Sequence, residues 1–374
     1  MLVEICKHRI FGTFVRHINF GTERLLSTEK TLVGHHLGNT RAAQTAEARR
    51  LFGQALESLK PYGKNLTLEV SDSMWGLGID VDSSDRQHLP ELKEILDLEV
   101  VDGRGSTLGF QSVRASFTPA WHTDRSSVLS IVLGGARDSG CPIHTFVISL
   151  DETPLAPCLA IGSTPGDPEA HRLPPEHLQL REVEADSLAV VCQNMKSLEL
   201  HIPETVISSS EPTFLSVKWL VSMASSIESF ELDLNPSATL YMPTETVTSS
   251  GMLGAVASKS IRALCLRNAA ATKGSLLNLF EKNRDSLREL ELNELFVCCV
   301  ASWRDLLREI SNKFFLETLV LHGLSSKVGT AAGSRDTAVA DRTTFEGKEQ
   351  IKAGVEQITS REFPPENPPA GFIF

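Results

Sequence analysis

Residues 287–292 read LRELEL, which follows the pattern apolar-x-x-apolar-x-apolar. The pattern recurs in one register along the chain, at residues 143–148, 195–200, 227–232, 261–266 and 316–321, with a weaker copy at 15–20. From residue 195 onward, successive copies start 32, 34, 26 and 29 residues apart. This spacing is close to the length of one strand plus one helix in repeat proteins. The sequence therefore predicts a repeated strand–helix unit.

The segments between these copies have the apolar spacing of helices. Apolar residues at intervals of three and four predict helices at residues 42–59, 128–137, 213–225, 249–258, 275–282 and 302–310. Thr272 is placed to cap the N-terminus of the helix at 275–282. Two further apolar segments predict strands at residues 66–70 and 95–101.

Each copy of the pattern ends in two apolar residues with one residue between them. Side chains alternate between the two faces of a strand, so the apolar pair faces the helices and the residues beside it face the other way. These outward residues are mostly polar: Glu199, His201, Glu231, Asp233, Arg267, Glu291, Asn293 and His322. A sheet covered on both faces would read as unbroken apolar strands. We therefore expect an α/β fold, an irregular leucine-rich-repeat-type solenoid with parallel strands on one face and helices on the other; the alternative is an open three-layer α/β sheet.

The regularity of the pattern differs along the chain. Residues 1–150 form an N-terminal irregular repeat region, and residues 181–324 form the leucine-rich-repeat-like region. Residues 151–180 are rich in Pro and Gly, which predicts a loop or linker between the two. Beyond residue 324 the periodicity is lost and four prolines precede the end, so we expect residues 325–374 to be a mostly disordered tail.

Composition narrows the classes of partner. The formal net charge is −11, which repels phosphate backbones, so we expect no nucleic-acid partner. No apolar run approaches the roughly 20 residues of a membrane-spanning helix, and the first twelve residues are too charged for a signal peptide. The seven cysteines are scattered and form no CxxC pair, which indicates a reducing cytoplasmic or nuclear compartment.

Several stretches resemble the repeat region of fungal F-box/leucine-rich-repeat proteins. They are SIRALCLR at 260–267, LRELEL at 287–292 and LETLVL at 316–321, while FVRHINF at 14–20 looks like the first strand after the F-box in that family. The resemblance implies the target-recognition part of a cullin-type ubiquitin-ligase receptor. The F-box itself does not precede Val15, and only Asn235 fits the usual repeat asparagine. The resemblance thus implies a ligase adaptor as partner only if an upstream F-box exists.

Other possible sites have simpler explanations. Residues 80–91 superficially follow a calcium-binding loop, but Asp85 stands where the sharp turn needs Gly. His35-His36 lacks further metal ligands, and His122-Thr123-Asp124 has no accompanying Gly-x-Ser-x-Gly motif. Cys298 and Cys299 lie in an apolar string that is typical of buried thiols. We expect no catalytic residue, no metal site and no cofactor.

The sequence therefore predicts a non-enzymatic protein–protein interaction scaffold that binds through its outward strand residues. The acidic bias of those residues favours a basic segment of a protein target. One alternative is a hydrolase or transferase, which would use Ser208, Ser209, Asn235 or Asn268 after the carboxyl ends of strands. The other is a degenerate repeat protein without a ligase role.

Overall fold

The fold of the chain is known from a computed structural model. The structure describes residues 2–9, 12, 14–21, 37–62, 65–71, 128–150, 178–203, 211–234, 247–298, 303–327 and 335–360, with single gaps at 181 and 340. It is a mixed α/β structure with a nine-stranded, mostly parallel sheet. In order across the sheet the strands are β1 (His17–Gly21), β2 (Leu66–Ser71), β3 (Ile143–Ser149), β4 (Ser197–His201), β5 (Ser229–Asp233), β6 (Ala263–Arg267), β8 (Glu289–Asn293), β10 (Thr318–His322) and β13 (Thr343–Glu346).

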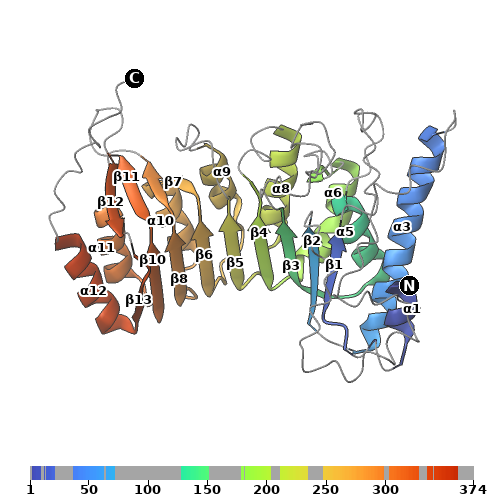
Figure 1. The fold of residues 1–374 in the computed structure, drawn as a ribbon, viewed down its shortest axis with the longest axis horizontal. Helices are drawn as coiled ribbons and strands as arrows, with labels where there is room; N and C mark the ends of the chain where they lie inside the picture. Colours follow the sequence, from blue (N-terminus) through green and yellow to red (C-terminus); the bar gives the residue numbers. More distant parts are fainter. Residues whose placement is uncertain are drawn as a thin grey trace, which may run out of the picture.

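The order of strands in this sheet is their order in the chain (Figure 1). The first eight are parallel to their neighbours, and β13 pairs with β10 in the antiparallel sense. Parallel strands are joined by right-handed crossovers in nearly all proteins. Because every crossover here steps in the same direction, this handedness places the connecting helices on the same face of the sheet.

The described helices form one row along that face. Each packs against the next in the chain. They are α1 (Leu2–Lys7), α3 (Leu37–Leu59), α5 (Val128–Ser139), α6 (Glu182–Gln193), α8 (Glu211–Met223), α9 (Val247–Ala255), α10 (Lys273–Lys282), α11 (Trp303–Lys313) and α12 (Lys348–Ser360), with a short 3-10 helix, η3 (Lys60–Tyr62), after α3. No helix among the described residues combines the length and apolar character needed to cross a membrane.

The core lies between the sheet and this row of helices. Its regular part consists of apolar residues at matching positions of neighbouring strands, such as Leu198, Phe230 and Leu264. Each of these exposes no more than 3% of its surface. Burying one such side chain stabilises the fold by about 1.5–3 kcal/mol. The repeated apolar positions in the sequence are therefore the inner face of the sheet.

The predicted repeats are confirmed as strands. The seven copies of the pattern correspond to β1, β3, β4, β5, β6, β8 and β10. Strand β3 begins with its copy at Ile143, and the other six strands begin two residues after the start of theirs. The helices predicted within residues 42–310 are present as α3, α5, α8, α9, α10 and α11. Thr272 caps α10, where its hydroxyl accepts a hydrogen bond from the Ser275 backbone N–H at 3.1 Å. The strand expected at 95–101 lies outside the described residues.

The sheet is continuous across the range predicted to be a linker. Strand β3 precedes residues 151–180 and β4 follows them, yet the two strands pair directly from Thr145–Ser197 to Ser149–His201. The two predicted regions thus contribute to one sheet. The Pro/Gly-rich stretch separates β3 from β4 in the sequence, but the two strands still form backbone hydrogen bonds with each other.

The prediction of a disordered tail at 325–374 is wrong for residues 343–360. Strand β13 pairs with β10, and α12 packs against α11. Ile351 and Val355 of α12 are 3% and 1% exposed, and Phe345 of β13 packs against the same core. These apolar residues bury the end of the core, which gives the segment a reason to fold.

A second, smaller sheet lies next to the carboxyl ends of the last repeat strands. Its strands, in spatial order, are β12 (Arg335–Val339), β11 (Leu324–Lys327), β9 (Phe296–Cys298) and β7 (Ala270–Thr272). Asn268, Glu294 and Gly323 each follow the last residue of β6, β8 or β10 and have φ values of 51°, 48° and 56°. The same left-handed turn thus leads the chain from the large sheet into the small one in three successive repeats.

Candidate binding surface on the open strand face

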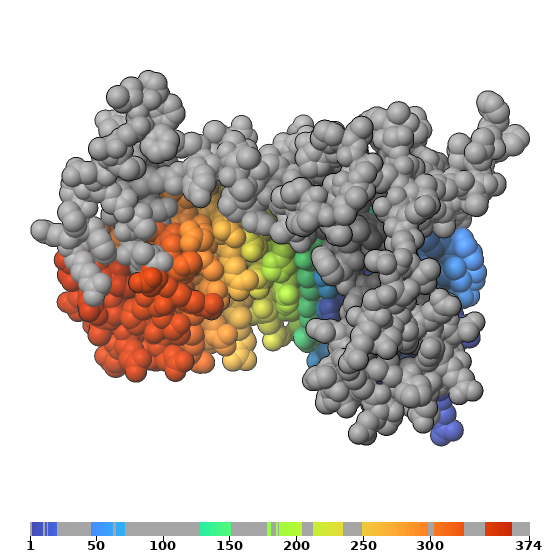
Figure 2. Space-filling view, viewed as in Figure 1, coloured from blue at the N-terminus to red at the C-terminus, as the bar shows by residue number. Residues whose placement is uncertain are grey.

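All eight residues predicted to bind a partner lie together on the side of the sheet away from the described helices. Together with Cys265, which was not predicted, they form two neighbouring rows across five strands. One row contains Glu199, Glu231, Cys265 and Glu291, and the other contains His201, Asp233, Arg267, Asn293 and His322. We call these nine residues the polar strand face. Figure 2 shows the part of the chain that contains the polar strand face, in lime to orange, on the side of the molecule that faces the viewer.

Strand geometry places these side chains. In β5, Phe230 and Leu232 are fully buried, while Glu231 and Asp233 alternate with them and are partly exposed. The same alternation holds in β6, β8 and β10. Because the register between neighbours has no shift from β4 to β10, every outward residue stands beside its counterpart.

Arg267 is at the centre of the ion pairs on this face. Its Nη1 donates to Glu231 Oε1 at 2.7 Å, and its Nε lies 3.5 Å from Glu291 Oε1. Arg342 Nη2 approaches the same Glu291 oxygen at 3.6 Å. Glu291 Oε1 is buried and accepts no hydrogen bond in the described structure. Two cations therefore compensate the charge of Glu291 without reaching hydrogen-bond distance.

His201 lies between two carboxylates. Its Nε2 is 3.8 Å from Glu231 Oε1, and its Nδ1 is 4.0 Å from Asp233 Oδ2. The interaction with Asp233 raises the pKa of His201 above the ordinary histidine value; burial opposes this, and Glu231 and Glu199 add to it. The face thus favours the imidazolium form.

Burial disfavours negative charge at two neighbouring positions. It raises the pKa of Glu231, against the opposing effect of Arg267 and His201. It also raises the pKa of the Cys265 thiol to about 12, and the carboxylates of Glu231 and Glu291 contribute in the same direction. A positive group brought to this face therefore gains more than it would beside exposed carboxylates.

The rim of the face contains two turn residues, Asn268 and Glu294, that were not among the predicted partner-binding residues. Asn268 was predicted only as a possible group of the alternative enzyme. Asn268 Nδ2 donates to Asp233 Oδ1 at 2.8 Å. His322 Nδ1 lies 2.7 Å from Asn293 Oδ1, and Glu294 is 3.4 Å from the same imidazole nitrogen. The turn residues Asn268 and Glu294 could have been found from their place one residue after an outward strand position.

Two further ion pairs involve residues outside the predicted set: His17 with Glu69 on the first two strands, and Arg342 with Glu291. His17 of β1 and Glu69 of β2 form an ion pair with 2.7 Å between Nε2 and Oε2. Arg342 lies within residues 325–374, which were predicted to be disordered, so its contact with Glu291 could not be predicted from the sequence. The face is thus part of a longer polar surface of the sheet.

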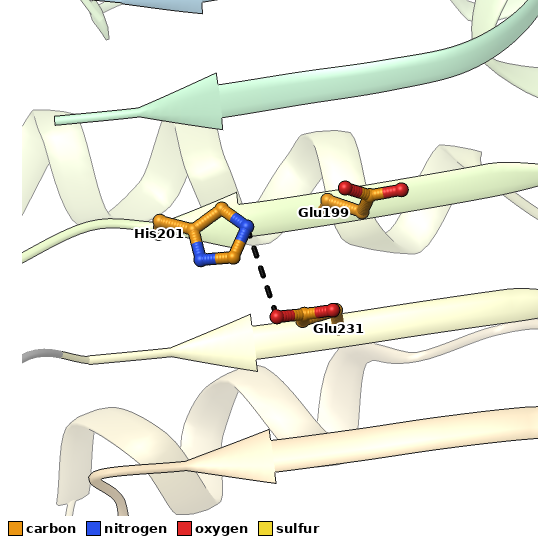
Figure 3. Close-up of side chains that lie close together, drawn as sticks. All are labelled: Glu199, His201 and Glu231. Carbon is orange, nitrogen blue, oxygen red and sulfur yellow. Dashed lines mark ion pairs between the residues drawn. The ribbon is translucent and has the colours of Figure 1, made fainter. Parts of the chain in front are cut away.

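Three residues of the face could hold a metal ion, although the sequence predicted no metal site. One ligand atom from each of Glu199, His201 and Glu231 lies within 4.8 Å of the others. Figure 3 shows the three side chains on neighbouring strands, with the helices behind the sheet. All three had been selected as outward residues; their closeness follows from the strand register.

Other candidate groups do not form a site in the described structure. Of the four groups that the alternative enzyme would use, Asn268 lies at the rim of the polar strand face, bonded to Asp233, and Ser208, Ser209 and Asn235 lie outside the described residues. Residues 80–91, His35-His36 and His122 also lie outside them. Cys6 and Cys192 are buried free thiols, and burial raises their pKa to about 11 and about 12. Such thiols are poor nucleophiles.

Comparison with known proteins gives no relative from which a function could be transferred. No family model matches the chain, and no curated protein or solved structure matches it at a significant level.

Proposed function

We propose that this chain is a non-enzymatic interaction protein, built as an irregular leucine-rich-repeat-type solenoid, whose polar strand face binds a positively charged segment of another protein. The architectural part is supported by strands that follow one another in chain order and by the single row of described helices. Both are typical of strand–helix repeats stacked in one dimension.

The charge of the polar strand face carries the proposal. Its two rows contain four carboxylates, from Glu199, Glu231, Asp233 and Glu291, against the guanidinium of Arg267 and the imidazole of His201. Arg342, outside the rows, approaches Glu291. Glu199 makes no ion pair with a described residue and accepts a hydrogen bond from the Ser197 hydroxyl at 3.2 Å. A lysine or arginine of a partner would supply the missing positive charge.

The rigidity of the face also favours binding. The carboxylates project from paired strands with a regular register, so the partner does not have to order them. Binding to preorganised groups loses less conformational entropy than binding to flexible ones. An extended basic segment lying across β4 and β5 would meet the carboxylates of Glu199, Glu231 and Asp233.

The resemblance to fungal F-box/leucine-rich-repeat proteins supports a role for such a face. In that family the repeats recognise the protein that is to be ubiquitinated. We extend the proposal to this role, in which the basic segment belongs to a ligase substrate. This extension depends on sequence motifs alone, because no family model matches the chain.

The proposal can be tested with a fluorescein-labelled oligo-arginine peptide and an acidic peptide of equal length. Fluorescence anisotropy at about 0.15 M salt would measure their affinities. Gln replaces Glu in the variant Glu199→Gln/Glu291→Gln, because it removes the charge at nearly constant size, whereas a lysine at position 291 would lie beside Arg267. We expect binding of the basic peptide to weaken about tenfold.

A matched variant controls for net charge. Glu281→Gln/Glu349→Gln removes the same charge from α10 and α12, on the helical side. It should bind the basic peptide like the original protein. Equal weakening by both variants would mean that the peptide is attracted only by the net charge of the protein. Unchanged binding by Glu199→Gln/Glu291→Gln would rule out the polar strand face as the binding site.

A further inference from the structure

We propose that Glu199, His201 and Glu231 form a binding site for one divalent transition-metal ion of the Zn²⁺ type. Glu199 and Glu231 stand directly opposite each other on β4 and β5, and His201 is two residues beyond Glu199 on the same side of β4. The three side chains therefore converge on one place above the sheet (Figure 3). The proposal concerns the protein alone and does not depend on a partner.

The distances fit a metal site that needs small adjustments. The three ligand atoms lie within 4.8 Å of one another, and His201 Nε2 is 3.8 Å from Glu231 Oε1. Ligand atoms bound to Zn²⁺ at about 2.0–2.2 Å cannot be more than roughly 4.4 Å apart. In a tetrahedral site the ligand atoms are roughly 3.4 Å apart, so closing the set requires two ligand atoms to approach each other by up to about 1.4 Å. Rotations of the half-buried side chains can share this movement.

The chemistry of the ligands selects the kind of ion. Carboxylates alone attract many cations, and Ca²⁺ and Mg²⁺ prefer oxygen ligands throughout. One imidazole nitrogen with two carboxylates instead suits Zn²⁺ and neighbouring transition metals. The fourth position faces away from the sheet and can be filled by water.

The charges around the three ligands are compatible with a bound cation. Glu199 makes no ion pair with a described residue, and the Ser197 hydroxyl orients its carboxylate. Arg267 donates to Glu231 Oε1, the same oxygen that lies 3.8 Å from His201 Nε2. A carboxylate oxygen has a second lone pair and the carboxylate a second oxygen, so this hydrogen bond and metal binding are compatible. Asp233 stands on the Nδ1 side of His201, where carboxylates commonly orient metal-binding histidines.

Cys265 lies next to the proposed site and could bind Zn²⁺ itself, so the experiment must distinguish binding by Cys265 from binding by the three proposed ligands. It is the counterpart of Glu231 on β6 and is partly exposed. A thiol is a strong ligand for Zn²⁺, although Cys265 is not among the three groups that lie within 4.8 Å of one another. A second histidine–glutamate pair, His17 with Glu69, offers a matched control on the same sheet.

The experiment is a Zn²⁺ titration of the full chain by calorimetry, repeated with Co²⁺ and followed by absorption spectroscopy. We expect one saturable ion per chain and a visible Co²⁺ spectrum without the charge-transfer band of a thiolate ligand. His201→Ala and Glu199→Gln should each weaken binding about tenfold or more. Cys265→Ser and His17→Ala should keep the affinity of the original protein.

Three results would overturn the assignment. They are the absence of saturable binding, loss of binding in Cys265→Ser, and equal weakening by His17→Ala and His201→Ala. Circular dichroism of each variant identifies a failure to fold, and Glu199→Gln tests the site independently if His201→Ala does not fold. Because the titration contains no peptide or partner, its outcome is separate from that of the proposed interaction function.

Discussion

Replacing Gly323 with Ala tests whether the left-handed turns hold the two sheets together. Gly323 has a φ of 56°, and its counterparts Asn268 and Glu294 have φ values of 51° and 48°. For a residue with a Cβ atom this conformation costs about 1–2 kcal/mol. The lower entropy of unfolded alanine offsets about 0.4–1 kcal/mol of that cost.

The added methyl group would also meet the Glu294 carboxylate, which is 53% exposed and able to move into solvent. Gly323→Ala should therefore lower the free energy of unfolding by about 1 kcal/mol, which changes the unfolding equilibrium about fivefold. Urea denaturation followed by circular dichroism would measure this change.

Gly254 provides a control for the same chemical substitution. It is exposed near the end of α9, has no positive φ and would place a Cβ with nothing within 4 Å. Gly254→Ala should stabilise the protein by about 0.5–1 kcal/mol, because alanine favours a helix. If both substitutions changed stability in the same direction, the reasoning about the left-handed turn would be refuted.

Three further predictions concern the face and the C-terminal segment. NMR titration should give His201 a pKa above about 6.5, and Asp233→Asn should lower it, because Asp233 is the largest cause of the upward shift. Since this pKa is raised in the folded state, the stability that His201 contributes is complete below the unfolded pKa and is lost as the pH rises through the folded value. Cys265, whose pKa is raised to about 12, should react with iodoacetamide at pH 8 more than about a hundredfold more slowly than a free cysteine. Gly354→Val should displace α12, because a Cβ there meets the Phe345 ring, and limited proteolysis should then cut within α12 sooner than in the original protein.

The repeat strands could be predicted because one physical requirement recurs. Every unit must bury apolar residues at the same positions, so Leu198, Phe230 and Leu264 mark equivalent places in the sequence. Six of the seven strands, all except β3, begin two residues later than the pattern, because its first apolar residue, such as Ile227, is buried where the chain returns from the helix.

The C-terminal segment could not be predicted in the same way. Strand β13 reads TTFE and runs antiparallel, so it lacks the apolar pattern of the parallel strands. Ile351, Val355 and Ile358 of α12 do have helical spacing. The small polar residues before them and the prolines after them hid this signal.

The outward residues of the candidate site could be predicted, but their contacts could not. Alternation within a strand assigns Glu199, His201 and Glu231 to the outer face. That Glu199 stands opposite Glu231 follows only from the register between strands. The side-chain conformations that bring Arg267 to Glu231 and Arg342 to Glu291 depend on the folded chain.

The strand-to-helix connections differ in length from the helix-to-strand connections. Only residues 140–142 connect α5 to β3, and residues 194–196 connect α6 to β4, whereas residues 72–127 join β2 to α5 and residues 150–181 join β3 to α6. Chain length therefore varies at the carboxyl edge of the sheet, while the short returns at the opposite edge keep the spacing of the repeats. This edge can accept inserted sequence without a change of strand register, which makes it the natural place to graft a reporter or a recognition loop. Any such insertion would emerge beside His201, Asp233 and their counterparts, the last residues of their strands.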